Sequence, residues 1–190
     1  MVKKNLIRVI IFLSLLVSTA NNCAAKKKDK QIEVYGNTLN LGVGIGYYGY
    51  LGGTTPFFFA NYEINVVRNF TLAPFIGFGS YRSSAYYYGG SGYYYTETVV
   101  PVGVKGTYYF DRLLHAGPRW DFYGAASLGF TYSKVTWQDG YSGNTTVAHT
   151  ASPLYIDLHI GAEYHIARRL GVFLDLSTGV STVGLAIHHR

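Results

Sequence analysis

Apolar residues alternate with small or polar residues through most of the chain after residue 37, and this period of two is typical of β-strands. No segment shows a strong helical repeat of about 3.6 residues. Clusters of Gly, Ser, Asn and Pro divide the alternating sequence into eight candidate strands. These are residues 38–51, 56–67, 70–82, 95–110, 120–135, 152–165, 170–178 and 182–189. The sequence therefore predicts an all-β domain.

One face of each candidate strand is apolar, and the only polar group on it is the Tyr phenol. In residues 152–165, for example, Leu154, Ile156 and Leu158 share this face. The opposite faces are rich in Gly, Ala, Ser, Thr and Asn, whereas a water-exposed face would carry long Lys and Glu side chains. Small polar residues suit a crowded interior, so we expect the apolar faces to lie outside, against lipid. A soluble barrel with its apolar faces inside is the alternative.

Lipid cannot satisfy backbone hydrogen bonds, so a sheet that crosses a membrane must close into a barrel. Tilted strands of about 9–11 residues are long enough to cross. Aromatic residues gather near the strand ends, as in the girdles at the two membrane surfaces. One group is Tyr47, Tyr48, Tyr50, Phe57 and Tyr132, and the other is Tyr108, Phe110, Trp120, Phe122 and Tyr164. The pattern predicts an eight-stranded antiparallel up-and-down transmembrane β-barrel over residues 36–190.

The N-terminus is typical of an export signal. Three basic residues (Lys3, Lys4 and Arg8) accompany an apolar run at 7–17 that is too short to span a membrane. Small residues follow, and Ala25 ends an acceptable cleavage site. We therefore expect residues 1–25 to be a cleaved signal peptide.

The formal net charge of +6 comes from the N-terminal pieces. After the signal, residues 26–35 form a short basic segment, while residues 31–190 hold nine Lys or Arg and nine Asp or Glu. The predicted barrel thus has no basic excess that would attract nucleic acid. Cys23 is the only cysteine, which excludes a disulfide framework and a four-cysteine metal site. It either leaves with the signal or carries the lipid of a lipoprotein.

Three stretches carry a family resemblance: VPVGVKGTYYF (100–110), WDFYGAASLGFTY (120–132) and LHIGAEYHIARRLGVFLDLSTGVS (158–181). They resemble the small outer-membrane β-barrel proteins of Gram-negative bacteria, the OmpA/OmpX/OmpW-like group. The resemblance extends over essentially all of 36–190 and implies the fold and the outer membrane. Its members do unrelated jobs, so it implies little about function. Such barrels usually end on an aromatic residue that the assembly machinery reads, whereas this chain ends His188-His189-Arg190.

Ionisable residues on the inward faces form a predicted lumenal polar network, which consists of Glu63, Lys105, Asp157, His159, Glu163 and Asp175. A buried unpaired carboxylate is costly, so these acids must pair, be protonated or meet water. We expect Lys105 to pair with Glu63, with Asp157 and Asp175 as competitors. The network either fills a closed barrel, whose eight strands leave room only for side chains, or lines a narrow cation-preferring water path.

Tyrosines dominate the loop SSAYYYGGSGYYYTE at 83–97. Tyr, Ser and Gly are frequent in binding loops, so this loop is a candidate surface for a protein or glycan partner. Its candidate residues are Tyr86, Tyr87, Tyr88, Tyr93, Tyr94 and Tyr95. Alternatively, these side chains extend the outer aromatic girdle. An export signal and an even number of strands would place both termini in the periplasm and this loop outside.

Catalytic and metal motifs are weak. Asp139, His149 and Ser152 share one loop, but no spacing fixes the geometry of a hydrolytic site. His159 and His165 are too far apart on one strand to bind a metal jointly without other strands. The sequence also lacks phosphate-loop, dinucleotide and zinc motifs. We therefore expect no enzyme activity and no catalytic, cofactor or metal site.

The sequence as a whole predicts an outer-membrane protein with a structural or surface-interaction role through its outer loops. A narrow pore or small-molecule conduit is the alternative function. The expected partners are outer-membrane lipid, the export and barrel-assembly machinery, and a protein or glycan at the outer loops. Nucleic acid is not expected as a partner.

Overall fold

The computed structural model describes residues 37–48, 53–82, 86–88, 91–110, 114, 116–144 and 152–189. Among these residues, no helix is long and apolar enough to cross a membrane. The predicted signal peptide (1–25) and basic segment (26–35) lie outside the described residues. The strands are β1 (Thr38–Tyr48), β2 (Gly53–Val67), β3 (Phe70–Arg82), β4 (Tyr86–Tyr88), β5 (Ser91–Tyr93), β6 (Tyr95–Tyr109), β7 (Trp120–Trp137), β8 (Leu154–Ala167), β9 (Leu170–Ser177) and β10 (Val180–His188).

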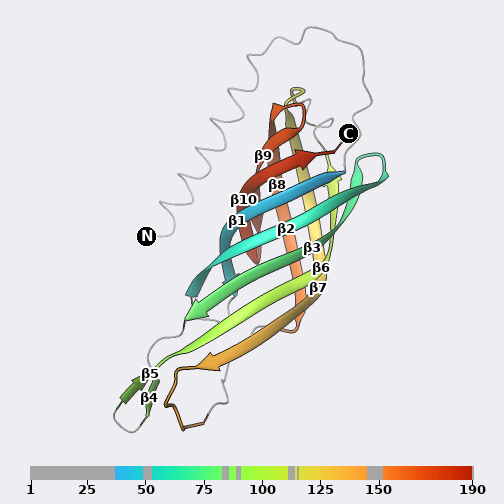
Figure 1. The fold of residues 1–190 in the computed structure, drawn as a ribbon. Coiled ribbons are helices and arrows are strands. Elements are labelled where there is room, and N and C mark those ends of the chain that lie inside the picture. Colours follow the sequence, from blue (N-terminus) through green and yellow to red (C-terminus); the bar gives the residue numbers. More distant parts are fainter. Residues whose placement is uncertain are drawn as a thin grey trace, which may run out of the picture.

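Eight of these strands close into an antiparallel barrel in the order β1-β10-β9-β8-β7-β6-β3-β2 (Figure 1). β1 closes the ring because Thr38 lies opposite both His188 of β10 and Glu63 of β2. β4 and β5 form a separate hairpin between β3 and β6. The predicted eight-stranded up-and-down barrel is therefore confirmed, and each wall strand is paired on both sides.

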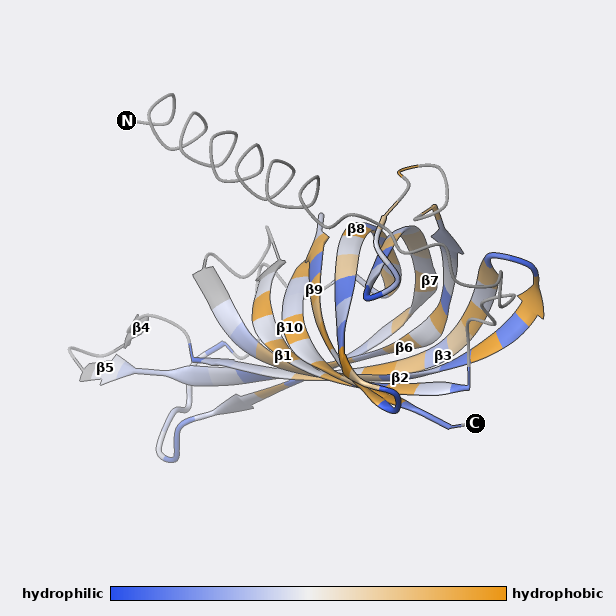
Figure 2. Cartoon of the chain, turned by 90° about the horizontal axis from the view of Figure 1, so that it is seen from above, coloured by the Kyte–Doolittle hydropathy of each residue, from blue (hydrophilic) through white to orange (hydrophobic). Residues whose placement is uncertain are grey.

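The wall has an apolar outer face and a mostly polar or small inner face. On β8, Leu158 is 59% exposed while its neighbours Asp157 and His159 are 1% and 9% exposed. The same alternation produces the orange bands along the wall strands in Figure 2. The outer surface can be solvated by hydrocarbon and closure satisfies the backbone, which is the architecture of a transmembrane β-barrel. The predicted outward faces are confirmed, and the soluble alternative is wrong.

The predicted strand boundaries agree with the observed ones to within a few residues. β7 is longer than predicted, since its pairing with β6 continues to Trp137 opposite Tyr95. These ends of β6 and β7, together with the β4–β5 hairpin, project past one end of the barrel (Figures 1 and 2). We refer to residues 91–98 and 134–144 as the extension.

Aromatic rings fill part of the lumen, which the sequence analysis missed. Phe57 was predicted in a girdle, but it is 1% exposed and packs against Val99 and Val180. Residues 57–59 are consecutive Phe, and strand alternation points only the middle ring outward. Gly79 makes room on β3, because a Cβ there would lie 2.3 Å from the ring of Phe57.

Candidate functional site

Glu63 is buried among hydrogen-bond donors rather than beside a cation. Its carboxylate accepts bonds from Asn40 Nδ2 at 2.9 Å, Thr71 Oγ1 at 2.8 Å and the Tyr109 hydroxyl at 2.6 Å. Among the described residues it makes no ion pair with Lys105, so the expected Glu63–Lys105 pairing is wrong. Three donors satisfy this carboxylate without a counter-charge.

Lys105 instead pairs with Asp175, across the lumen from β6 to β9. The Lys105 Nζ to Asp175 Oδ2 distance is 2.5 Å, and both side chains are at most 5% exposed. Asp175 also accepts a hydrogen bond from the Tyr123 hydroxyl at 3.1 Å and lies 2.8 Å from Nδ1 of His159. Asp175 on β9 is thus contacted by side chains from three other strands, β6, β7 and β8, and Lys105 neutralises its charge.

Asp157 holds the turn between β9 and β10. Its oxygens accept hydrogen bonds from the backbone N–H of Gly179 at 2.8 Å and of Val180 at 3.2 Å, and from the Thr178 hydroxyl at 2.7 Å. The Tyr155 hydroxyl adds another at 3.0 Å. These contacts account for a carboxylate that is 1% exposed, and they fix the turn at one mouth of the barrel.

Ser127, His159 and Asp175 form a hydrogen-bonded line of the kind that activates a serine nucleophile. Ser127 Oγ lies 2.9 Å from His159 Nε2, and His159 Nδ1 lies 2.8 Å from Asp175 Oδ1. Acyl transfer also needs a path for substrate and donors for the oxyanion. Ser127 is 2% exposed, and the internal cavity that His159 and Asp175 line has a volume of about 10 Å³. That is room for about one water molecule, so this line fits a structural network.

Of the weak hydrolytic combination Asp139, His149 and Ser152, the structure describes Asp139 and Ser152. The Ser152 hydroxyl donates to the carbonyl of Leu154 at 3.1 Å. His149 lies outside the described residues.

The lumen is packed on both sides of the Lys105–Asp175 ion pair. Toward the extension, the Phe75 ring stacks on Phe59 at 5.3 Å between centroids and contacts Tyr155 at 5.2 Å. In the other direction, the rings of Tyr109 and Tyr123 meet at 5.8 Å. A conduit needs a continuous file of water, and the cavity between these layers holds about one molecule. The described side chains therefore favour a closed barrel over a water path.

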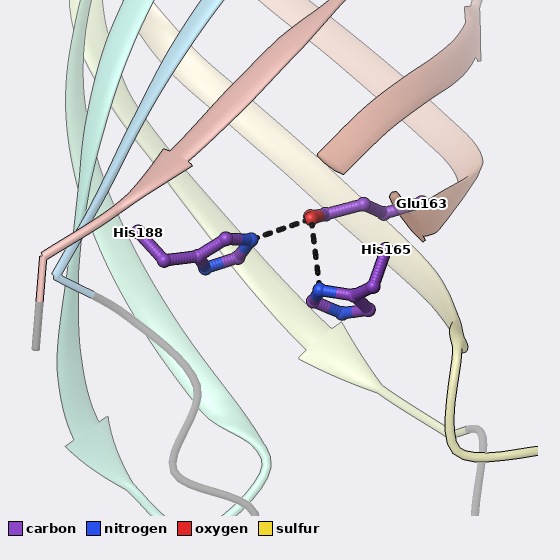
Figure 3. Close-up of side chains that lie close together, drawn as sticks. All are labelled: Glu163, His165 and His188. Atoms are coloured by element: carbon purple, nitrogen blue, oxygen red, sulfur yellow. Dashed lines mark hydrogen bonds and ion pairs between the residues drawn. The ribbon is translucent and has the colours of Figure 1, made fainter. Parts of the chain in front are cut away.

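A second cluster lies at the end of the lumen where β1 begins and β10 ends (Figure 3). Glu163 Oε1 lies 2.6 Å from His188 Nε2 and 3.7 Å from His165 Nδ1. On the far side of the His165 ring, Nε2 lies 2.8 Å from Asp121 Oδ2. Sequence reasoning missed this cluster because β9 separates the two strands that carry the histidines.

The extension carries four aromatic rings linked by successive contacts, which we call the aromatic cluster: Tyr93, Tyr141, Trp137 and Tyr95. The Trp137 ring stacks on Tyr141 at 4.2 Å and contacts Tyr95 at 5.1 Å. Burial, followed by the nearby Tyr81 and Glu97, raises the pKa of Tyr95 above its ordinary value. A tyrosine hydroxyl at its ordinary pKa is already protonated at physiological pH, and this shift moves Tyr95 further from ionising.

The predicted tyrosine surface is divided by the structure. Tyr93 and Tyr95 belong to the aromatic cluster, whereas Tyr94 contacts the Arg82 guanidinium, whose carbon lies 4.6 Å from the ring centroid. Tyr86, Tyr87 and Tyr88 form β4, and their side chains lie outside the described residues. Trp137 and Tyr141 were not predicted, although the alternation of β7 continues through residue 137.

No protein-family profile and no curated protein matches the sequence. Solved structures of similar architecture include a designed transmembrane β-barrel (15% identity, 80% of this chain and 96% of the other covered, TM-score 0.42). Others are Ail, the attachment invasion locus protein of Yersinia pestis solved with the heparin analogue sucrose octasulfate (9%, 78% and 92%, 0.45), and Neisserial surface protein A (13%, 80% and 95%, 0.44). These likenesses concern the fold alone. Strand order and face chemistry make this chain a small eight-stranded barrel of the outer-membrane type.

Proposed function

We propose that this protein is a surface-interaction protein of the outer membrane, with a closed structural barrel and a binding surface on the extension. In this proposal residues 1–25 are a cleaved export signal, residues 26–35 are a periplasmic segment, and the barrel-assembly machinery inserts residues 36–190. The partner is a protein or glycan outside the cell. The closed lumen argues against the alternative of a narrow conduit.

The aromatic cluster is the observation that carries the proposal. Tyr and Trp supply rigid contact area at low entropic cost, and their polar atoms can orient a partner. Pairing of β6 with β7 up to Tyr95 and Trp137 holds two of the four rings on a sheet rather than on a loop. Such a preordered surface loses little entropy on binding.

Binding is tested with cells that display the protein, using arrays of glycans and of extracellular-matrix proteins. The double variant Tyr95→Ala/Trp137→Ala should lose about 30-fold in affinity for the ligand found, as for a hot spot of about 2 kcal/mol. Tyr94→Ala is the matched control, because this ring contacts Arg82 instead of the cluster. Equal binding by wild type and double variant, or an equal loss in Tyr94→Ala, would contradict the proposal.

Orientation is tested by adding protease to whole cells. The proposed topology expects cleavage within 83–94 or 136–151 and protection of the turn at Arg168-Arg169. Cleavage of that turn in intact cells would reverse the assignment of the two ends.

Ion conductance tests the alternative function. In planar bilayers the refolded protein should give no defined single-channel steps, because aromatic layers lie on both sides of the Lys105–Asp175 ion pair. Reproducible cation-selective steps would establish the conduit instead.

A further inference from the structure

The cluster of Glu163, His165 and His188 offers the donor atoms of a transition-metal site (Figure 3). One oxygen and two imidazole nitrogens lie within 4.8 Å of one another. In tetrahedral zinc sites with bonds of about 2.0–2.1 Å, neighbouring donor atoms lie about 3.3–3.4 Å apart. The observed 2.6 Å and 3.7 Å separations bracket that value. Small side-chain adjustments would therefore bring the three atoms around one ion.

The second ring nitrogen of each histidine has a hydrogen-bond partner that fixes the orientation of the ring, as is usual for histidines that bind a metal. Nε2 of His165 faces the Asp121 carboxylate at 2.8 Å, and a carboxylate can only accept, so this nitrogen carries the proton. The Nδ1 lone pair of His165 is then directed toward Glu163. Nδ1 of His188 lies 3.0 Å from the Thr38 hydroxyl, whose oxygen can accept a hydrogen bond from the Nδ1–H when Nε2 binds a metal. Asp121 and His165 thus match the carboxylate–histidine–metal arrangement, and Thr38 plays the part of the carboxylate for His188.

Gly171 leaves space for the carboxylate between the two histidine-bearing strands. It lies on β9 opposite His165 of β8 and opposite Ala186 of β10. A Cβ at this position would lie 2.0 Å from Glu163 Oε1. The missing side chain lets Glu163 lie across β9 and reach His188. β9 thus provides the space for a site whose ligands come from β8 and β10.

The donor set also limits the class of ion. Two imidazoles and one carboxylate suit Zn²⁺, Cu²⁺, Ni²⁺ or Fe²⁺, whereas Mg²⁺ and Ca²⁺ prefer oxygen ligands alone. Glu163 is 5% exposed, but the side chains of His165 and His188 are 24% and 17% exposed. An ion can therefore enter from this mouth of the barrel.

We propose that Glu163, His165 and His188 bind one divalent transition-metal ion, with Zn²⁺ as the representative, at the end of the barrel where its two terminal strands meet. Three protein ligands leave a fourth position for water or another donor. The ion links β8 to β10 across β9. Asp121 and Thr38 are positioning residues that hold the two rings.

Zinc binding is measured on the full-length protein after the cell has removed the export signal. The protein carries no polyhistidine tag and is folded in detergent. Equilibrium dialysis with metal analysis should find one Zn²⁺ per chain in wild type and in His189→Ala, the matched control for the exposed neighbouring histidine. His165→Ala and His188→Ala should lose this binding. Asp121→Asn should bind about 10–100-fold more weakly, as expected when a residue behind a metal ligand is changed. Millimolar Mg²⁺ should not compete.

A spectroscopic measurement on the wild type keeps the test independent of how the variants fold. Cu²⁺ loaded at one equivalent should show electron paramagnetic resonance couplings to two imidazole nitrogens, and to one in each folded single-histidine variant. A folded wild type that binds no Zn²⁺, or Cu²⁺ without coupling to two nitrogens, overturns the proposal. Undiminished binding by folded His188→Ala also overturns it, and the cluster is then only a set of ion pairs.

Discussion

One face of β6 serves two regions that differ in chemistry. Inside the barrel this face carries Lys105 and Val99, which are 4% and 0% exposed. Farther out the same face carries Tyr95, a half-buried ring of the aromatic cluster. In the lumen each group must be matched to a fixed neighbour, because no water replaces a lost contact. In the extension, water or a binding partner can replace a contact that a substitution removes. We therefore expect lumen changes to affect stability and extension changes to affect binding.

The strongest test of the lumen is Lys105→Met. It leaves the Asp175 carboxylate without its cation, which should lower the free energy of unfolding by about 3–5 kcal/mol. Urea unfolding from liposomes measures this change. Adding Asp175→Asn should recover part of the loss, whereas adding Glu63→Gln should not, because Glu63 bonds to Asn40, Thr71 and Tyr109. If Glu63→Gln, and not Asp175→Asn, recovers the stability of Lys105→Met, then Lys105 pairs with Glu63 as the sequence predicted.

The outer face of the wall should respond to charge rather than to lost contacts. Leu158→Arg places a cation against hydrocarbon, which should cost about 2–4 kcal/mol near the bilayer midplane. Ser127→Ala, on the opposite face, removes one hydrogen bond to His159 and should cost about 1 kcal/mol. Unfolding from liposomes should separate the two variants clearly. Equal costs would mean that the two faces are not solvated differently.

Packing between the polar network and the extension is tested by Gly79→Ala. The added Cβ would lie 2.3 Å from the Phe57 ring, and this ring is fixed by Val99 and Val180. Overpacking of this kind should cost about 1–3 kcal/mol. Gly124→Ala is the matched control, because its Cβ would find its nearest contact at 3.8 Å. A neutral Gly79→Ala would show that the Phe57 layer can yield, and the closed lumen would lose support.

The sequence predicted the strands and their faces because both depend on local alternation, which lipid enforces on each wall strand separately. It did not predict which lumenal groups meet. Lys105 reaches Asp175 rather than Glu63 because strand stagger around the ring, which no single strand encodes, sets the depth of each side chain. His165 and His188 come together only through closure of the barrel over β9. The sequence analysis assigned Phe57 to a girdle because an aromatic residue near a strand end is equally compatible with a girdle and with the lumen.

The smallest expected effect on stability belongs to the extension. Trp137→Ala should change the free energy of unfolding of the barrel by no more than about 0.5 kcal/mol, as for a surface substitution away from the core. Trp137 stacks on Tyr141 and contacts Tyr95, and all three rings lie beyond the packed lumen. The same variant should weaken partner binding, while Gly79→Ala should leave binding unchanged in the protein that folds. Both variants are measured for unfolding from liposomes and for partner binding by cells that display them. The four values compare the lumen with the extension. If Trp137→Ala lowers stability as much as Gly79→Ala, the extension belongs to the folded core, and the aromatic cluster serves packing rather than recognition.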